Sequence, residues 1–295
     1  MTIKSLFKNY LNPCRTLLGM TTQDEQSYFE KYACTNYSGE GEIVDLGCWL
    51  GSTTIPLAKG LYKNPNPKVQ SRKIHAFDQF IWEEWMDDFV KGTQLEGKYK
   101  PGKSFLEEFK KRIQPWSASV KIYAGDLCQI GWDGKEIEFL LIDAMKSWEL
   151  LNAIISKFFP CLIINKSYIV HQDFAHWYTS WIHLIQYRLR KYFKLVHIIP
   201  NSTSFIFKYV NEIPKEMLNM NYSASSFSEE EVEYAFEHSI NLVSDKFTQA
   251  RIASAKVMLF IHLDNKARAK YELDKYLTKG LPLVSDLKVV KERLT

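Results

Sequence analysis

Short apolar segments recur along the first two thirds of the chain, and most of them end in an acidic residue or a glycine. Segment 137–143 is almost continuously apolar, which is typical of a strand buried on both faces of a parallel sheet, and segment 74–78 is predicted as a strand that ends in the acid Asp78. Segment 120–127 alternates apolar and polar residues before Gly125 and Asp126, as a half-buried strand does. Two more short runs, 43–46 and 168–170, bring the number of predicted parallel strands to five.

Two further apolar segments, 193–199 and 204–209, flank the turn Pro200–Thr203. A short polar turn between two such segments predicts an antiparallel hairpin. The five preceding strands are separated by stretches long enough for helices, which is the pattern of an α/β fold with a mostly parallel sheet. We therefore predict seven strands, the last of them antiparallel.

Helical spacing dominates the two ends of the chain. Residues 1–40 are predicted as a helical lead-in, 41–210 as the sheet domain and 211–295 as a helical appendage. Ser228 followed by Glu231 predicts a capping box at the start of the appendage. Its apolar stripes predict three or four short helices, whose expected role is packing or formation of a homo-oligomer.

The composition of the chain is compatible with this predicted fold. The chain has 295 residues, 46% of them hydrophobic, which is enough for one full α/β domain with an appendage. Its net charge of +4 is mild, and no block of Lys and Arg indicates a nucleic-acid partner. No apolar run is long enough to span a membrane. Five scattered cysteines favour reduced thiols in a cytoplasmic protein: Cys14, Cys34, Cys48, Cys128 and Cys161.

The first strand leads into a glycine loop. Gly47 and Gly51 stand four positions apart after Asp45, and a helix is predicted to begin at about Ser52. Glycine lets the backbone turn sharply and approach a ligand, and a following helix directs its free N–H groups at the turn. The bulky Trp49 does not fit the G-x-G-x-x-G pattern of a dinucleotide site. The loop therefore predicts a small-molecule pocket, or else an ordinary strand-to-helix turn.

An acid followed by G-x-x-x-G resembles the first motif of class I S-adenosylmethionine-dependent methyltransferases, and the order of strands resembles their Rossmann-like seven-stranded sheet. This resemblance implies that S-adenosylmethionine lies over Gly47 and Gly51, with Asp78 binding the ribose and Asp126 the adenine edge. A carboxylate suits the ribose because it can accept two hydrogen bonds at once. The cofactor-binding residues so implied are Asp45, Gly47, Trp49, Gly51, Ser52, Thr53, Asp78, Gln79, Asp126, Leu127 and Asp143.

The segment Asp143–Lys146 has the form D-x-x-K, which resembles the catechol and caffeoyl-coenzyme-A O-methyltransferases. In those families the acid binds a divalent metal and the lysine lies beside the acceptor oxygen. The resemblance implies a metal site of Asp143, Gln172 and Asp173 for Mg²⁺ or Mn²⁺. Gln172 departs from the family pattern, which has Asp-Asp or Asp-Asn here. The alternative interpretation of Lys146 is a cation on the surface of a helix.

A histidine could act as general base in place of a metal, because its usual pKa lies near neutral pH. His171 is the first candidate because it adjoins Gln172 and Asp173, and His176 is the second. Lys146 is the third, and it needs a lowered pKa to serve. The alternative interpretation of each histidine is a core residue at the end of a strand, with no role as a base.

The glycine loop and the segment His171–Phe174 together resemble the macrocin O-methyltransferases and the related cephalosporin hydroxylase group, over residues 41–210. This implies methyl transfer to an oxygen of a sugar or phenolic natural product. The absence of a D/N-P-P-Y/F/W motif argues against methylation of a nucleic-acid base. A hydroxylase on the same fold, or an assembly protein that only binds the cofactor, is the alternative.

About forty residues separate Asp78 from the third predicted strand, more than a crossover helix needs. Such segments near the carboxyl ends of strands are often lids or acceptor pockets. Trp82, Trp85 and Phe89 in this segment are candidates for lining it, or else form the inner stripe of an amphipathic helix.

Overall fold

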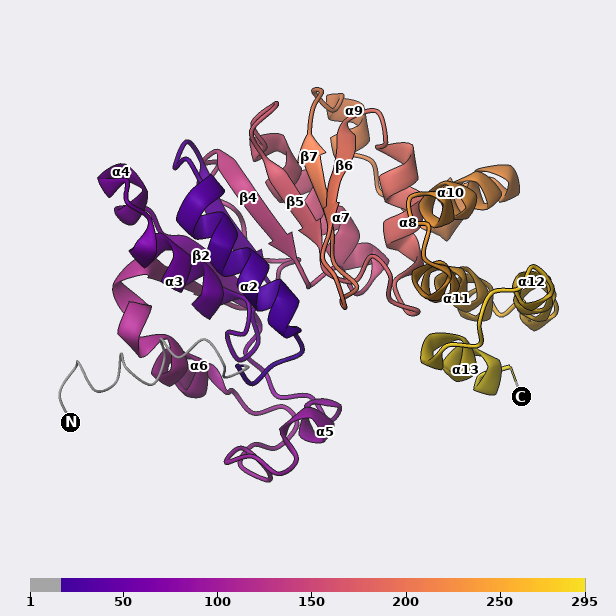
Figure 1. Cartoon of the computed structure of the whole chain (residues 1–295), viewed down its shortest axis with the longest axis horizontal. Coiled ribbons are helices and arrows are strands. Elements are labelled where there is room, and N and C mark those ends of the chain that lie inside the picture. Colours follow the sequence, from indigo (N-terminus) through magenta and orange to yellow (C-terminus); the bar gives the residue numbers. More distant parts are fainter. Residues whose placement is uncertain (1–16, 295) are drawn as a thin grey trace. The chain divides into compact units, whose positions relative to one another are not determined.

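The computed structural model of the chain describes residues 17–294, so Cys14 lies outside the described part. One seven-stranded sheet runs through the molecule in the order β3-β2-β1-β4-β5-β7-β6 (Figure 1). β1 pairs in parallel with β2 and with β4, and β2 pairs in parallel with β3. β7 is antiparallel to both β5 and β6. The predicted Rossmann-like sheet is thus confirmed, with these strands: β1 (Glu42–Leu46), β2 (Ile74–Asp78), β3 (Val120–Ala124), β4 (Ile137–Ile142), β5 (Tyr168–His171), β6 (Phe193–Ile198) and β7 (Phe205–Tyr209).

The chain packs as two compact units. The first contains the residues up to Asp143 together with Ile199–Ser202, and the second contains Ala144–Ile198 and the residues from Thr203 on. The predicted domain ranges, 1–40, 41–210 and 211–295, follow the sequence pattern rather than this packing and stay predictions.

In the first unit, α2 (Gln23–Lys31), η1 (Tyr32–Asn36) and α3 (Thr54–Lys63) pack together. The side chains of Phe29 and Tyr32 place their rings 6.4 and 4.3 Å from that of Phe139 on β4. Thr22 begins α2 with a complete capping box, because its hydroxyl accepts from Glu25 N and its own N–H donates to the Glu25 carboxylate. All five residues of β1 and all six of β4 are buried, as a central parallel strand requires.

The long segment between β2 and β3 holds α5 (Met86–Val90), α6 (Leu106–Ile113) and η2 (Gln114–Ser119), and α4 (Pro67–Gln70) precedes β2. Trp82 is completely buried here, and its indole N–H donates to Asp87. Trp85 and Phe89 are 48% and 45% exposed. A single inner stripe is therefore the wrong description of these three aromatic residues, since only Trp82 belongs to the core.

The second unit contains β5, β7 and β6 with the helices that follow them in sequence. Residues Ala250 to Val290 contribute a core of small and aliphatic side chains that joins α11, α12 and α13. Ser228 caps α10 as predicted, but the Glu231 carboxylate binds Arg188 at 2.9 and 2.5 Å instead of completing the capping box. The helical elements are α7 (Trp148–Phe158), η3 (Phe159–Cys161), α8 (Ser180–Arg188), α9 (Lys215–Leu218), η4 (Ala224–Ser226), α10 (Glu229–Asn241), α11 (Lys246–His262), α12 (Lys266–Thr278) and α13 (Ser285–Glu292).

A network of charges joins α10, α11 and α12. Lys256, 1% exposed, binds Glu272 at 3.0 Å and Glu233 at 2.7 Å, and Glu272 is completely buried. Arg268 and Lys275 bind the same two carboxylates. We call these five residues the helical charge network. Their spacing along the sequence gave no sign of it, because the charges come from three separate helices.

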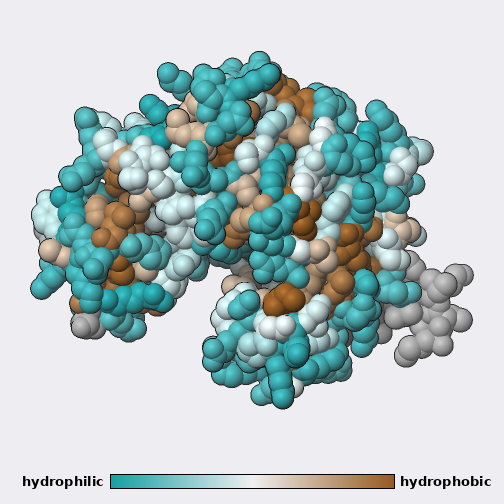
Figure 2. Space-filling view, turned by 180° about the vertical axis from the view of Figure 1, so that it is seen from behind, coloured by the Kyte–Doolittle hydropathy of each residue, from teal (hydrophilic) through white to brown (hydrophobic). Residues whose placement is uncertain are grey.

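The surface combines many hydrophilic side chains with several smaller hydrophobic areas (Figure 2). Between residues 17 and 294, no helix has both the length and the apolar character needed to cross a membrane.

Candidate functional site

The loop after β1 has the left-handed backbone that its glycines predict. φ is +90° at Gly47 and +86° at Gly51, and Trp49 between them also has a positive φ of 39°. Glycine adopts this region freely, whereas a tryptophan does so only when its surroundings hold it there. Gly47 N donates to Phe77 O at 2.8 Å, and Gly51 N donates to Cys48 O at 2.7 Å. These bonds fix the loop between the carboxyl ends of β1 and β2.

Asp45 lies completely buried under this loop. Its Oδ2 accepts hydrogen bonds from the hydroxyls of Thr53 at 2.8 Å and Thr54 at 2.6 Å. Its Oδ1 has no hydrogen-bond partner in the described part of the chain. Burial raises the pKa of Asp45 to about 6, against the smaller opposing effect of the two hydroxyls. Asp45 therefore holds the start of α3 against the loop, and Thr54 is a partner that sequence reasoning missed.

Asp78, at the end of β2, reaches the same loop. Trp49 N donates to its Oδ2 at 2.8 Å, and Phe80 N donates to its Oδ1 at 2.7 Å. Burial raises the pKa of this carboxyl above its usual range. Each carboxylate oxygen has two lone pairs, so one acceptor position on each oxygen is left after these two bonds. Asp78 thus combines a role in shaping the loop with capacity for two further donors.

The other predicted residues of this edge lie on the loops that follow β2, β3 and β4. Asp126 is partly buried, and its Oδ1 accepts from Cys128 N at 2.8 Å. Asp143 N donates to Leu46 O at 2.9 Å, which places Asp143 beside the end of β1. Leu127 is 4% exposed, whereas Gln79 is exposed. The structure thus orders these residues along the carboxyl ends of the parallel strands.

Ser52 and Thr53 are both buried in the turn that leads into α3. Ser52 O accepts a hydrogen bond from the hydroxyl of Thr21 at 3.3 Å. A Cβ atom on Gly19 would lie only 2.2 Å from Ser52 Oγ, so the backbone before α2 passes directly over this turn. This cover of the loop by residues 19–21 had no signal in the sequence.

Three aromatic side chains gather on the glycine loop. The ring of Trp49 lies 5.8 Å from that of Trp85 and 6.1 Å from that of Phe89. The Trp49 indole N–H is buried and has no hydrogen-bond partner in the described part of the chain. Trp85 and Phe89 leave nearly half of their surface open to solvent. Large exposed rings beside a ligand loop are a surface on which a planar or ring-shaped molecule can stack.

Lys146 and Asp173, both in the second unit, form an ion pair through Nζ and Oδ2. Gln172 beside Asp173 is 4% exposed, and its Oε1 has no partner in the described part. Residues 17–294 contain no group of three or more His, Cys, Asp or Glu side chains that could hold a metal ion. A divalent cation on Asp173 would have to compete with the lysine ammonium, so this pairing does not fit the predicted metal site. The set Asp143, Gln172 and Asp173 stays an untested prediction.

His171 is a core residue of β5. It is 1% exposed, and its ring lies 6.4 Å from Phe174 and 6.0 Å from Phe207. Burial lowers its pKa to about 4. The ring is therefore neutral at physiological pH, but an acceptor molecule has no direct route to it in this conformation.

His176 is partly exposed and has charged neighbours. Burial lowers its pKa, and Asp173, Lys146, Asp286 and Arg251 act on it with opposing signs. Its Nδ1 accepts a hydrogen bond from Tyr178 N at 3.4 Å, which is long for such a bond. His176 is consequently neutral and partly exposed, and this long hydrogen bond favours one tautomer of its ring only weakly.

No protein-family model matches this chain, and no curated protein matches it. Solved structures do. The O-methyltransferase NovP is 13% identical, with a TM-score of 0.49, and the alignment covers 66% of this chain and 83% of NovP. CalS11, a calicheamicin methyltransferase, is 13% identical over 71% of this chain and 91% of its own, with a TM-score of 0.45. The plantazolicin methyltransferase BpumL, in complex with SAH, is 15% identical over 82% and 70%, with a TM-score of 0.31. Similarities of this size do not transfer an activity, which must be judged from the chain's own residues.

Proposed function

We propose that this chain is a class I S-adenosylmethionine-dependent methyltransferase acting on an oxygen of a small molecule. One observation carries the proposal. A left-handed glycine loop lies between two acids, the buried Asp45 and the partly buried Asp78, at the carboxyl ends of adjacent parallel strands. Ligands of open α/β sheets bind at this edge, where the order of strands reverses. In this sheet the reversal falls between β1 and β4.

Each residue of this edge has a role in the proposed binding. The left-handed backbone at Gly47 and Gly51 turns the loop sharply, so that its backbone would lie against the methionine part of the cofactor. The remaining acceptor positions of Asp78 take the two ribose hydroxyls, and Asp126 faces the adenine amino group. When bound, the cofactor supplies an electrophilic methyl group on a sulfonium.

Among the three candidates, we favour His176 as the general base because of its own surroundings. It is neutral and partly exposed, whereas His171 is enclosed and the Lys146 side chain is paired with Asp173. Its long contact with Tyr178 N lets the ring change tautomer at little cost, which frees a lone pair for the acceptor hydroxyl. His176 would take that proton, and the bound cofactor would supply the methyl group to the acceptor oxygen. No step of this mechanism passes through a metal.

The aromatic surface of Trp85 and Phe89 supports an acceptor that carries a ring. Aromatic side chains can pack against the flat face of a phenol and against the apolar face of a sugar. We therefore propose a phenolic or sugar-bearing natural product as the acceptor class.

The activity is tested by incubating the purified chain with S-adenosylmethionine and a panel of phenols and glycosides. Mass spectrometry should detect S-adenosylhomocysteine together with a product heavier by one methyl group. Consumption of oxygen with no S-adenosylhomocysteine would instead indicate a hydroxylase, and absence of any turnover with tight cofactor binding would indicate an assembly protein.

The base is tested by single-turnover methyl transfer with His176→Ala, His171→Ala and Lys146→Ala. Loss of a general base lowers the rate by about 10²–10⁴-fold. We expect that loss for His176→Ala and a smaller one for Lys146→Ala. Equal rates in all three variants and the unaltered chain would remove these residues from consideration.

A further inference from the structure

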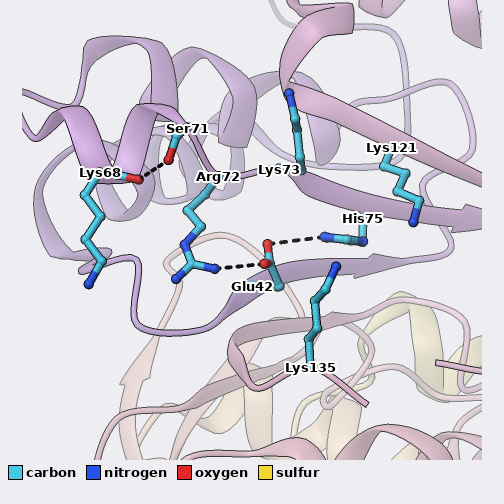
Figure 3. Close-up of a pocket in the computed structure, with 8 residues that line it drawn as sticks. All are labelled: Glu42, Lys68, Ser71, Arg72, Lys73, His75, Lys121 and Lys135. Atoms are coloured by element: carbon cyan, nitrogen blue, oxygen red, sulfur yellow. Dashed lines mark hydrogen bonds and ion pairs between the residues drawn. The ribbon is translucent and has the colours of Figure 1, made fainter. Parts of the chain in front are cut away.

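A concave site lies in the first unit, at the ends of the strands opposite to the glycine loop. It is a cavity of about 320 Å³ lined by Glu42, Lys68, Ser71, Arg72, Lys73, His75, Lys121 and Lys135 (Figure 3). Glu42 begins β1 and Lys121 lies near the start of β3, so the cavity is at the amino ends of the strands. The glycine loop and its acids are at the carboxyl ends. The two sites therefore use different edges of the same sheet.

The cavity has a large excess of positive charge. Five of its eight lining residues are Lys or Arg, and Glu42 is the one carboxylate among them. That carboxylate is already satisfied, since its two oxygens bind Arg72 Nη1 at 2.9 Å and His75 Nε2 at 3.2 Å (Figure 3). The charge of the remaining lysines is therefore not balanced by Glu42.

The lysines that surround Glu42 in this cavity have few acidic partners. Lys121 Nζ lies 4.8 Å above the ring of Tyr123, and Lys73 Nζ contacts the carbonyl of Ala118. Lys135 pairs with Asp133 at 3.0 Å, an exposed ion pair that contributes little. Within residues 17–294, no ion pair involves Lys68 or Lys121. Like charges in a concave surface repel one another, and an anion that enters relieves this repulsion.

We propose that this cavity binds a small, multiply charged anion that carries a phosphoryl or pyrophosphoryl group. Such a group presents several acceptor oxygens and about two negative charges, which match several ammonium donors better than a single carboxylate does. The volume is at the lower end of small-molecule sites and suits a phosphorylated metabolite or pyrophosphate. The cations come from residues 68–73, 121 and 135, so no basic block marks the site in the sequence.

Calorimetric titration of the full chain with sodium pyrophosphate at low ionic strength tests the proposal. The double variant Lys121→Ala/Lys135→Ala should weaken binding by about tenfold, because each lysine removes a charge-assisted contact. Lys110→Ala/Lys111→Ala removes the same charge from α6, outside the cavity, and should change the affinity by less than about twofold. All four lysines are exposed, so the variants should unfold at the same temperature as the unaltered chain.

A third arm adds saturating S-adenosylhomocysteine, which should leave pyrophosphate binding unchanged because the two sites are at opposite strand ends. Three results would overturn the proposal: no binding to the unaltered chain, equal weakening in both double variants, or displacement of pyrophosphate by S-adenosylhomocysteine. Failure of S-adenosylhomocysteine to bind would count against the proposed methyltransferase and not against this cavity.

Discussion

Carboxylates with several hydrogen-bond or ion-pair partners occur in two regions of this molecule, and their partners differ in kind. On the edge that carries the glycine loop, Asp45 and Asp78 receive hydrogen bonds from neutral hydroxyl and backbone N–H groups. In the helical charge network, Glu233 and Glu272 are bound by Lys and Arg side chains. Each region contains one completely buried carboxylate, Asp45 or Glu272, but only the second supplies opposite charge to balance it.

The pKa values shift in opposite directions as a result. Burial raises the pKa of Asp45 to about 6 and also raises that of Asp78. Burial acts in the same direction on Glu233, but the ammonium groups of Lys256 and Lys275 outweigh it and hold the pKa at about 2. The network thus balances its negative charge with cations and contributes to the stability of the helices. The loop edge keeps unbalanced acceptors, which is what a site for a ligand rich in donors requires.

The largest effect expected in this comparison is on the network. Lys256→Met leaves Glu272, which is completely buried, without one of its cations, and should lower the free energy of unfolding by about 3 kcal/mol. Lys270→Met, an exposed change on α12, is the matched control and should stay within about 0.5 kcal/mol. Urea unfolding measures both. A Lys256→Met variant as stable as its control would show that the network is dispensable.

An effect of opposite sign and at most equal size is expected on the loop edge. Because its folded pKa is raised, ionised Asp45 destabilises the fold above pH 6, and this cost disappears as the pH falls below the usual value of 3.8. Asp45→Asn should therefore be more stable than the unaltered chain at pH 8, by up to about 3 kcal/mol, which is the full value of the shift from 3.8 to about 6, and equally stable near pH 3.5. Urea unfolding at the two pH values would contradict the account if Asp45→Asn were less stable at pH 8.

The smallest expected effect concerns Glu233, whose contribution to stability should depend on pH in the opposite sense to that of Asp45. The folded pKa of Glu233 is lowered, so its contribution is present above the usual value of 4.5 and is lost as the pH falls towards 2. Glu233→Gln should lower stability at pH 7 by less than about 1 kcal/mol, since the side chain is one-third exposed, and the difference should shrink in acid. A difference that grew in acid would reverse the sign assigned to this group.

The features that the sequence predicted are local ones. β2 spans the predicted residues 74–78, and the hairpin of β6 and β7 has the predicted turn between its strands. The glycine loop was visible because strand, acid, glycines and helix follow one another within about ten residues. Contacts that join distant segments had no such signal. Lys256 with Glu272, the cover of Ser52 by residues 19–21, and the lysines of the basic cavity all depend on how the elements pack.

The histidines show, for single side chains, that the sequence could not predict which residues become enclosed by packing. His171 and His176 had similar claims in the sequence because both follow the fifth predicted strand. The structure separates them by burial, since His171 belongs to the core of β5 and His176 is partly exposed. Strand alternation could place neighbouring side chains on opposite faces, but it could not show which face is enclosed by Phe174 and Phe207.

Calorimetry of S-adenosylhomocysteine binding tests the central claim most directly. The unaltered chain should bind one molecule, and Asp78→Ala should weaken binding by about 2–4 kcal/mol, or roughly 30- to 800-fold, because two charge-assisted hydrogen bonds are lost. Asp88→Ala, an exposed acid on α5, should bind like the unaltered chain, and circular dichroism should show that each variant is folded. Equal affinity in folded Asp78→Ala and the unaltered chain, or no binding to the unaltered chain, would contradict the placement of the cofactor on this loop.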